Sequence, residues 1–221
     1  MRWHDDHAET PPKSSKRARA AVRAFDVAVA TVAIIVLTPL MLAVAIAVKL
    51  DSPGPLIYGS PRLGPGGRVF KAWKFRSMYT DAEARLADIL RSDQRLREEY
   101  HHFHKLRHDP RLTPLGFIIR RTSLDELPQL FNILCGEMSV VGPRPNLLSE
   151  RAVFGPMLDT VLLVKPGLTG LWQISGRNRL PISERVVLDL EYVRTRTLAG
   201  DVRICLKTFV QLWRPAKHGA Y

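Results

Sequence analysis

The chain has 221 residues, of which 33 are Lys or Arg and 21 are Asp or Glu, so its formal net charge is +12. A hydrophobic content of 46% excludes general disorder, and two cysteines are too few for a fold held together by disulfides. The length predicts one domain with an appendage. The excess of positive charge indicates an anionic partner, which is a nucleic acid, an acidic membrane surface or a phosphorylated small molecule.

A long uncharged stretch follows a basic segment near the start of the chain. Residues 10–25 contain five Lys or Arg and no acid, and residues 27–48 then carry no charge at all. As a helix, such a stretch is about 33 Å long, which exceeds the roughly 30 Å of a bilayer's hydrocarbon core. The stretch is therefore predicted to enter a membrane.

The path of this stretch in the membrane depends on a proline and on charge. Pro39 lies within it, where proline breaks or kinks a helix. Residues 52–80 are again basic without any acid, and positively charged loops prefer the cytoplasm. A helix–break–helix that enters and leaves by the cytoplasmic face accommodates both basic flanks. A single spanning helix and a cleaved signal peptide are the alternatives.

The remainder of the chain predicts an α+β domain that is mostly helical with a small β-hairpin. Pro and Gly are concentrated in residues 51–67, which indicates loops and turns. Apolar residues at helical spacing in residues 81–107 indicate a long amphipathic helix. The expected elements are a short strand at 56–58, a turn at 64–67, a strand at 69–75, a helix at 81–107, a helix from Ser183 and a final helix that follows residues 200–201 and ends at about 213.

The densest group of residues with chemical potential is the stretch 120–128, RRTSLDELP. Its spacing fits a capping box at the start of a helix, with Thr122 or Ser123 as the N-cap. Pro128 lies too deep for the first turn of an ordinary helix that begins there. We therefore expect an irregular turn in which the acidic pair points outward.

That acidic pair is Asp125 and Glu126, and Arg120 and Arg121 precede it. Cationic surroundings keep carboxylates ionised. Mg²⁺ binds one carboxylate together with diphosphate oxygens, which leaves the second carboxylate free to attack phosphorus, while arginines balance the charge of the transferring group. The stretch therefore indicates phosphate chemistry, with a purely structural helix cap as the alternative.

Two further arginines occur in stiff or tightly turning segments. Arg144 lies between two prolines, which lowers the entropy lost when its guanidinium binds an anion. Arg177 follows a glycine in the sequence Ser175–Asn178 (SGRN). Each of them taken singly is more typical of a surface loop, so the concentration of such arginines in one third of the chain carries the functional interpretation.

Together these motifs resemble the bacterial sugar transferase family, the monotopic polyprenyl-phosphate phosphoglycosyl transferases. The resemblance extends over nearly everything after residue 16, and the size is similar to that of compact members that begin exopolysaccharide synthesis by transferring galactose 1-phosphate. The matching stretches are Lys74–Met78 (KFRSM), Thr122–Gln129 (TSLDELPQ), Gly136–Pro145 (GEMSVVGPRP), Lys165–Asn178 (KPGLTGLWQISGRN) and Gly219–Tyr221 (GAY).

The resemblance implies how the chain is organised. Family members have a re-entrant membrane helix that is broken at a proline, which matches Pro39. The implied arrangement is a basic arm (1–23), a re-entrant helix (24–50) and a cytoplasmic catalytic domain at the membrane interface (51–221). The protein is thereby expected at the cytoplasmic face of the bacterial inner membrane, with anionic lipids around its basic flanks.

The resemblance also implies a reaction. Asp125 attacks the β-phosphate of a UDP-sugar, UDP-galactose or UDP-glucose, releases UMP and holds the phosphosugar covalently. Undecaprenyl phosphate then accepts the phosphosugar, and Glu126 helps to place Mg²⁺. A mechanism in which both substrates bind together, without a covalent intermediate, is the alternative.

The remaining site residues are implied by position in the family's motifs. Arg120, Arg144, Arg177 and Asp201 fall on active-site positions, with the arginines as phosphate or nucleotide contacts, and Lys74 and Arg76 belong to a shared motif. A basic, membrane-anchored protein that binds nucleic acid is the rival from another class. It leaves the acidic pair without a task, and the sequence contains no helix-turn-helix, zinc-finger or stacked-aromatic signature, so no nucleic-acid partner is expected.

Overall fold

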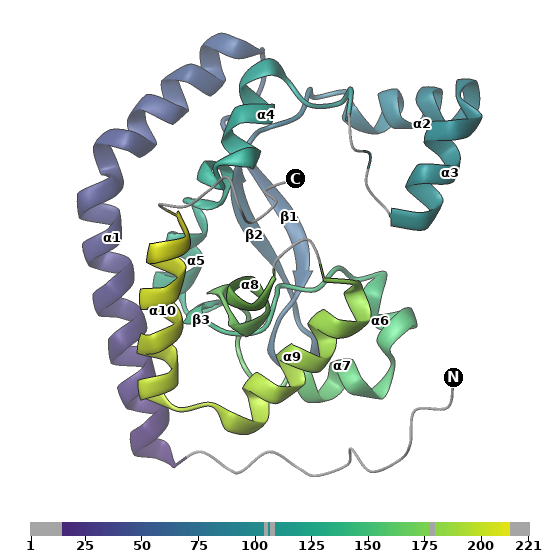
Figure 1. The fold of residues 1–221 in the computed structure, drawn as a ribbon. Coiled ribbons are helices and arrows are strands. Elements are labelled where there is room, and N and C mark those ends of the chain that lie inside the picture. The colour runs from purple at the N-terminus through teal and green to yellow at the C-terminus, as the bar shows by residue number, and fades with distance from the viewer. Residues whose placement is uncertain (1–14, 104–105, 107–108, 177–179, 213–221) are drawn as a thin grey trace. The chain divides into compact units, whose positions relative to one another are not determined.

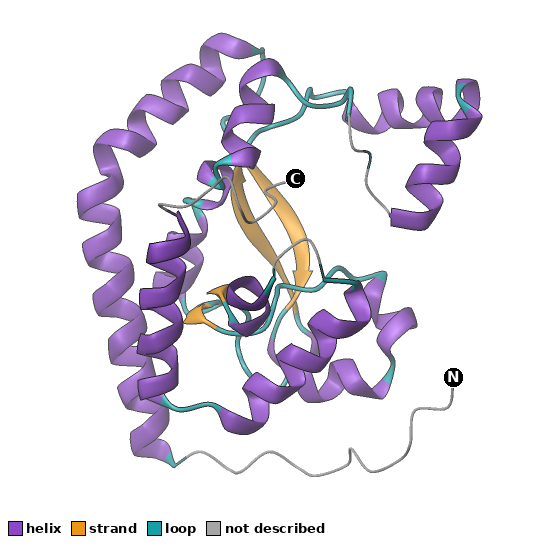
Figure 2. Ribbon diagram, in the orientation of Figure 1, coloured by secondary structure: helices purple, strands orange, loops and turns teal. Residues whose placement is uncertain are grey.

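The computed structural model describes residues 15–103, 106, 109–176 and 180–212, and helices dominate this part of the chain (Figures 1 and 2). The helices are α1 (Lys16–Asp51), α2 (Ala82–Ser92), α3 (Gln94–Phe103), α4 (Pro114–Arg121), α5 (Gln129–Cys135), α6 (Glu150–Phe154), α7 (Pro156–Val161), α8 (Leu171–Ser175), α9 (Ile182–Thr195) and α10 (Leu198–Leu212). The strands are β1 (Ile57–Leu63), β2 (Val69–Phe75), β3 (Ser139–Val141) and β4 (Gly167–Thr169), with 3₁₀ turns η1 (Pro65–Gly67) and η2 (Leu124–Glu126).

The chain folds as two compact units, which are described separately. Unit 1 combines the chain up to Ile35 with Ser60–Ala72 and the residues from Gln129 onward. Unit 2 combines Val36–Gly59 with Trp73–Pro128. Helix α1 and the β1–β2 hairpin therefore each contribute residues to both units.

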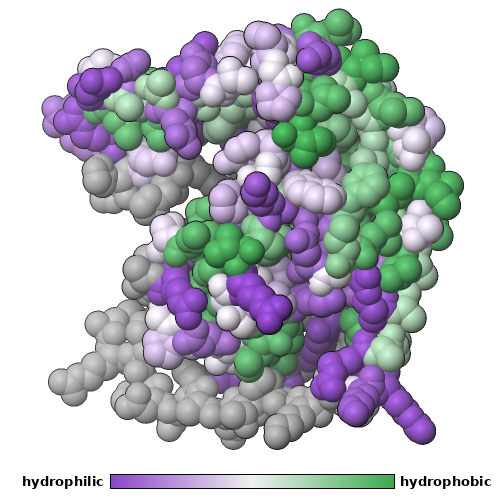
Figure 3. Space-filling view, turned by 180° about the vertical axis from the view of Figure 1, so that it is seen from behind, coloured by the Kyte–Doolittle hydropathy of each residue, from purple (hydrophilic) through white to green (hydrophobic). Residues whose placement is uncertain are grey.

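Helix α1 is long and apolar enough, by length and composition, to cross a membrane. Ile35 and Val36 are each 68% exposed and Leu50 is 82% exposed, so large apolar side chains face outward along it. Figure 3 shows apolar residues along the edge of the molecule on which α1 lies. Helical structure continues through Pro39, so the predicted break is not seen in the structure, and the re-entrant path stays a prediction.

In unit 2, a buried apolar cluster holds the end of α1 against its neighbours. Val44 and Val48 of α1 pack with Phe75, the last residue of β2, and with Ile119 of α4. Each of these side chains is at most 7% exposed. Because β2 and α4 share this cluster, the residues that follow each element are held in one region of the unit.

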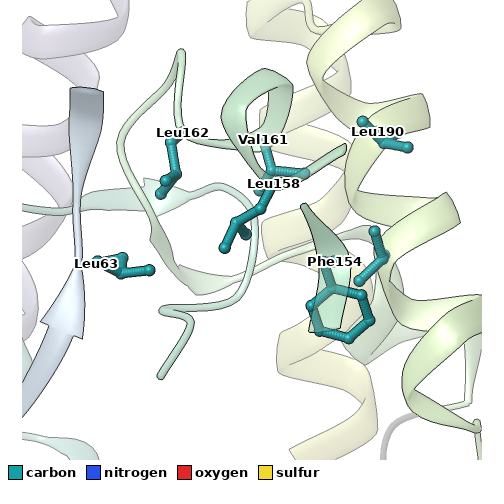
Figure 4. Packing of buried hydrophobic residues seen from close by; sticks show 7 residues of the cluster. Leu63, Phe154, Leu158, Val161, Leu162 and Leu190 are labelled. Carbon is teal, nitrogen blue, oxygen red and sulfur yellow. The ribbon is translucent and has the colours of Figure 1, made fainter. Parts of the chain in front are cut away.

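Unit 1 contains a second core, shown in Figure 4. Leu158 and Val161 of α7 pack with Leu190 of α9, and Leu63 closes the cluster from the end of β1. Beside this core, β3 and β4 pair in parallel, with Ser139 opposite the first residue of β4. The cluster fixes α9, which also carries the carboxylate of Asp189 described below.

A buried carboxylate ties the first part of α1 to the rest of unit 1. Asp26 is 2% exposed and accepts hydrogen bonds from Ser139 Oγ at 2.8 Å and from the backbone N–H of Val140 at 2.8 Å. Arg23 donates to the carbonyls of Ile133 and Leu134 at the end of α5. Charged hydrogen bonds of this kind are roughly twice as strong as neutral ones, so α1 is fastened by polar as well as apolar contacts.

The structure confirms several predicted elements and corrects others. The hairpin is present, and its second strand has the predicted bounds, whereas the first strand extends from Ile57 to Leu63. The single helix expected at 81–107 is wrong, because Asp93 is extended and separates α2 from α3. The Asp93 side chain accepts from the N–H of Leu96 at 3.1 Å and so starts a new helix, a capping preference that outweighs helical periodicity.

Candidate active site

The acidic pair lies on the short turn η2 of unit 2, between α4 and α5. Helix α4 ends at Arg121, and the Thr122 hydroxyl donates back to the carbonyl of Ile118 at 2.8 Å. Ser123 then adopts a left-handed conformation with φ of 60°, the one positive φ outside glycine among the described residues. This conformation costs about 1–2 kcal/mol, and such strain is common at functional sites.

The capping box, which was the structural alternative for this stretch, is not present. Ser123 precedes η2 without any capping hydrogen bond from its side chain, and α5 starts only at Gln129, directly after Pro128. The left-handed Ser123 comes after the C-cap of α4, which is Thr122, and precedes a single 3₁₀ turn rather than the first turn of an α-helix. The prediction of an irregular turn is confirmed.

Lys74 of β2 bridges the two carboxylates. Its Nζ lies 2.6 Å from Oε1 of Glu126 and 3.6 Å from Oδ2 of Asp125. The Glu126 side chain is 37% exposed, whereas that of Asp125 is 6% exposed. The expectation that both acids point outward is therefore confirmed for Glu126 and wrong for Asp125.

The environment of Asp125 changes its acidity. Burial, together with the charge of Glu126, raises the pKa of Asp125 to about 6, although Lys74 and Arg120 favour the ionised form. The cationic neighbours favour the ionised form, as expected, but loss of hydration outweighs their attraction and leaves the pKa of Asp125 above its ordinary value. A carboxylate with a pKa near 6 is ionised at neutral pH but less well solvated than an exposed one, which favours nucleophilic and acid–base chemistry.

Arg120 lies close to this pair and remains exposed. It is the last but one residue of α4, and its Nε donates to Ser77 Oγ at 3.0 Å. Ser77 follows β2 and is itself buried. Unit 2 therefore brings together four charged residues of this region, Lys74, Arg120, Asp125 and Glu126.

Arg76 belongs to the same motif as Lys74, but its side chain contacts the end of α1 and not the acidic pair. It is 6% exposed and donates to the carbonyls of Val48 and Ser52 at the end of α1, and to that of Pro53 at 2.9 Å. Cations near the C-terminus of a helix satisfy its last carbonyls. Arg76 therefore stabilises the C-terminal end of α1. A role of Arg76 in substrate binding stays a prediction.

Arg144 belongs to unit 1 and has acidic partners of its own. Its Nη1 donates to Oε1 of Glu150 at 2.7 Å, and its backbone N–H donates to Oδ2 of Asp189 at 3.2 Å. About a fifth of the Arg144 side chain is exposed. The guanidinium is therefore held in place while part of it stays accessible.

Asp201, also in unit 1, is almost wholly buried. Its Oδ1 accepts from the Tyr192 hydroxyl at 2.7 Å, and its Oδ2 lies 3.5 Å from Nε of Arg196. Burial raises the pKa of Asp201, which the contacts with Tyr192 and Arg196 offset in part. These partners give Asp201 a role in packing α9 against α10, and its role in the active site stays a prediction. Arg177 lies outside the described residues.

The acidic pair is suited to a metal ion that is also bound by the substrate. Among the residues that the structure describes, no group of three or more His, Cys, Asp or Glu could hold a metal ion by itself. Mg²⁺, however, is usually bound through one or two carboxylates together with phosphate oxygens and water. The exposed Glu126 and the neighbouring Asp125 fit that smaller requirement.

Two carboxylates that the structure places next to Arg144, those of Glu150 and Asp189, were not expected as its partners. Asp189 lies on the helix expected from Ser183, whereas no helix was expected at Glu150. Asp189 interrupts the apolar side of α9, next to Leu190. An acid at a buried helix position is a signal for a partner, and it was available in the sequence.

Three features described above occur together in this chain: an excess of basic residues, an apolar helix of membrane length and an acidic pair bridged by Lys74 beside Arg120. They are typical of a membrane-associated protein that carries out phosphate chemistry. Residues 17–215 match the family model described as bacterial sugar transferase. The chain therefore belongs to the bacterial sugar transferase family, and the resemblance inferred from its motifs is confirmed.

Several relatives carry informative names. The chain is 46% identical to an uncharacterized sugar transferase of Haemophilus influenzae over 186 residues. This alignment covers 84% of this chain and 39% of the relative. It is 42% identical to an undecaprenyl-phosphate galactose phosphotransferase of Salmonella typhimurium, over 94% of this chain and 43% of the relative. The exopolysaccharide production protein ExoY of Sinorhizobium fredii is 44% identical, over 84% of this chain and 82% of the relative. The chain thus spans about four tenths of the first two relatives and about four fifths of the third.

Proposed function

We propose that this protein is an undecaprenyl-phosphate sugar phosphotransferase, which moves a sugar 1-phosphate from a UDP-sugar to undecaprenyl phosphate at the start of exopolysaccharide synthesis. The observation that carries the proposal is the pair Asp125 and Glu126, bridged by Lys74 beside Arg120. This group combines a poorly solvated carboxylate with cations that stabilise charge on a phosphoryl group. The names of the relatives support the substrate classes.

In the proposed reaction an Asp125 oxygen attacks the β-phosphorus of the UDP-sugar. The bond between that phosphorus and the bridging oxygen breaks, and UMP leaves with the electron pair. A phosphate oxygen of undecaprenyl phosphate then attacks the same phosphorus, and the Asp125 carboxylate is regenerated as the lipid diphosphate-sugar forms. No proton needs to be added at either step, because attacking and leaving groups are all anions.

Lys74 has a specific part in this proposal. In the resting protein its ammonium neutralises Glu126 and lies near the buried Asp125. An arriving diphosphate is a stronger anionic partner than a single carboxylate, so Lys74 is expected to move onto a phosphate oxygen. That movement removes the group that lies beside Asp125 and makes its carboxylate available for attack.

Glu126, with Asp125 beside it, is the group we expect to hold Mg²⁺. Held by these carboxylates together with substrate, Mg²⁺ would supply positive charge that offsets the charge of the diphosphate and of the departing UMP. The exposed position of Glu126 supports this assignment, because a metal that is shared with a substrate has to be reached from solvent. The buried Asp125 is better suited to the nucleophilic role.

We further propose that α1 is re-entrant and holds the catalytic groups at the cytoplasmic face of the inner membrane. The basic flanks and the exposed apolar face of α1 support this placement. Cysteines introduced singly at Ser15 and at Thr80, with Cys135 and Cys205 replaced by Ser, test it in spheroplasts. A re-entrant helix leaves both positions unreactive towards an impermeant maleimide, whereas a spanning helix exposes one of them.

The reaction is tested with a panel of UDP-sugars, undecaprenyl phosphate and purified membranes. UMP release that depends on both the protein and Mg²⁺ is the expected result, and UDP-galactose and UDP-glucose are the first donors to compare. A phosphosugar adduct trapped on the protein without the lipid acceptor distinguishes the covalent route from simultaneous binding of both substrates. Salt-sensitive binding of oligonucleotides without UMP release from any UDP-sugar contradicts the proposal.

A further inference from the structure

The segment Pro143–Asn146 of unit 1 is held at both ends by main-chain hydrogen bonds. Gly167 N–H donates to the Pro143 carbonyl at 2.8 Å, and Leu63 N–H donates to the Asn146 carbonyl at 2.9 Å. Gly167 allows this approach because a Cβ there would lie only 2.1 Å from the nitrogen of the adjacent Gly142. The segment is therefore rigid, and Arg144 in its centre has a fixed backbone.

A carboxylate on α6 fixes the Arg144 side chain. Glu150 accepts from Arg144 Nη1 through one oxygen, at 2.7 Å, and from the N–H of Leu147 through the other, at 2.6 Å. The Glu150 side chain is 11% exposed, so this pair is only partly hydrated. A charge pair with such limited hydration orients the guanidinium more firmly than a surface pair does.

A second carboxylate, Asp189 of α9, approaches Arg144 from the protein interior. It is 2% exposed, and its Oδ2 accepts from the backbone N–H of Arg144 at 3.2 Å. Its other oxygen, Oδ1, is buried and has no hydrogen-bond partner among the described residues. A buried polar atom that lacks a partner is uncommon and requires an explanation.

Packing alone does not explain an acid at this position. The hydrogen bond to Arg144 needs an acceptor but no charge, and an Asn side chain has the same shape and the same acceptor. The charged groups that act on Asp189 are Arg144, Glu150 and Arg185. Burial raises the pKa of Asp189 to about 8, although both arginines favour its ionised form.

The protonation of Asp189 therefore changes the charge around Arg144. When Asp189 is ionised, two carboxylates cancel the two guanidinium groups of Arg144 and Arg185. When it is protonated, one positive charge remains, while the hydrogen bond from the Arg144 backbone is kept. An anionic ligand of Arg144 gains from that remaining charge, because Coulomb interactions are strong where water is largely excluded.

We propose that Asp189 is a positioning residue that holds Arg144 and whose charge state sets the affinity of Arg144 for a nucleoside diphosphate. The inference rests on the proposed function, which names UDP as the nucleotide to test. It assigns to Asp189 two separable effects. Its oxygen fixes the Arg144 backbone at every pH, and its negative charge opposes the bound nucleotide only when the proton is lost.

The test measures UDP binding to the detergent-solubilised full chain by calorimetry, from pH 7 to pH 9. For the unmodified protein we expect the dissociation constant to rise roughly tenfold over this range, the size of effect that one unit charge has at short range. Asp189→Asn keeps the acceptor without the charge, so its dissociation constant should stay near the pH 7 value throughout. Asp189→Leu removes the acceptor and should bind UDP more weakly at every pH.

Glu191→Gln is the matched control, because Glu191 lies on the same helix but is exposed. This variant should reproduce the pH dependence of the unmodified protein. An Asp189→Asn variant that loses affinity with pH as the unmodified protein does overturns the inference, as does an unmodified protein whose affinity is independent of pH. In both cases UMP release from a UDP-sugar still upholds the proposed function. Absence of both UDP binding and UMP release overturns the proposed function and the inference together.

Discussion

Asp125 in unit 2 and Asp189 in unit 1 are both buried carboxylates near arginines, and burial raises the pKa of both, yet they are held differently. Asp125 lies on a 3₁₀ turn after a strained residue, and its neighbour Lys74 is a flexible side chain 3.6 Å away. Asp189 lies within a long helix whose next residue is packed in the core, and its partner is a backbone N–H. The comparison teaches that a side-chain counterion, which can move away, suits the nucleophilic role proposed for Asp125, whereas a backbone partner suits the positioning role proposed for Asp189.

The largest expected effect tests Asp125. Asp125→Asn should lower UMP release by about 10³-fold or more, because an amide cannot replace a carboxylate nucleophile. Membrane association should persist, since α1 is unchanged. Asp88→Asn is the control, because that exposed side chain pairs only with Arg91 of the same helix among the described contacts. Substantial turnover by Asp125→Asn would remove Asp125 as the nucleophile.

The counterion is tested next. Lys74→Met removes both ion pairs while keeping a long side chain, and we expect kcat to fall about 10- to 100-fold, because a cation that acts on the phosphoryl group is lost. Lys71→Met, a change on the same strand at an exposed position, should leave turnover near that of the unmodified protein. Equal losses in the two variants would show that strand β2 is sensitive to any loss of charge.

The acidity of Asp125 predicts a pH dependence. Because its pKa is raised to about 6 and the ionised form is the nucleophile, kcat/KM should fall about tenfold for each pH unit below that value. Lys74 favours the ionised form, so the fall should begin at a higher pH in Lys74→Met. If the pH profile is the same in both proteins, the fall in kcat/KM at low pH is not caused by protonation of Asp125.

The smallest expected effect concerns stability and tests Asp189. In the unfolded chain Asp189 has an ordinary pKa near 4, whereas in the folded protein it is about 8, so between these values the folded state binds more protons. The free energy of unfolding should therefore decrease as the pH rises through this window. Asp189→Asn should weaken that dependence and raise the melting temperature at pH 8 by a few degrees, as measured by thermal unfolding in detergent. A melting temperature that falls at pH 8 would contradict it.

The features that were predicted correctly from the sequence depend on local chemistry. The hairpin followed from Pro and Gly around two apolar strands, and the membrane-type helix followed from a charge-free run between basic flanks. The irregular turn at η2 followed from Pro128, which lies too deep for an ordinary first helical turn. The motifs then identified the family, which the family match confirmed.

The features that could not be predicted depend on contacts between distant residues. Nothing in the spacing of Arg120–Pro128 shows that Lys74, about fifty residues earlier, would lie between the two acids. The burial of Asp125 has the same origin, since loss of hydration is decided by neighbours that the local sequence does not contain. The strained Ser123 was also hidden, because serine is a common helix cap and its sequence favours that interpretation.

Asp26 raises a question about how the protein is made. Its hydrogen-bond partner Ser139 is 113 residues further along the chain, so the ribosome completes the apolar helix long before that partner exists. During that interval the newly made helix carries a carboxylate with no native ligand, which disfavours deep burial of its first turns in lipid. In the membrane-inserted protein that we propose, stable insertion is thereby tied to emergence of the later segment, and a nascent chain arrested before Ser139 leaves the ribosome should be extracted from membranes more readily than one arrested after Ser139 and Val140 have emerged.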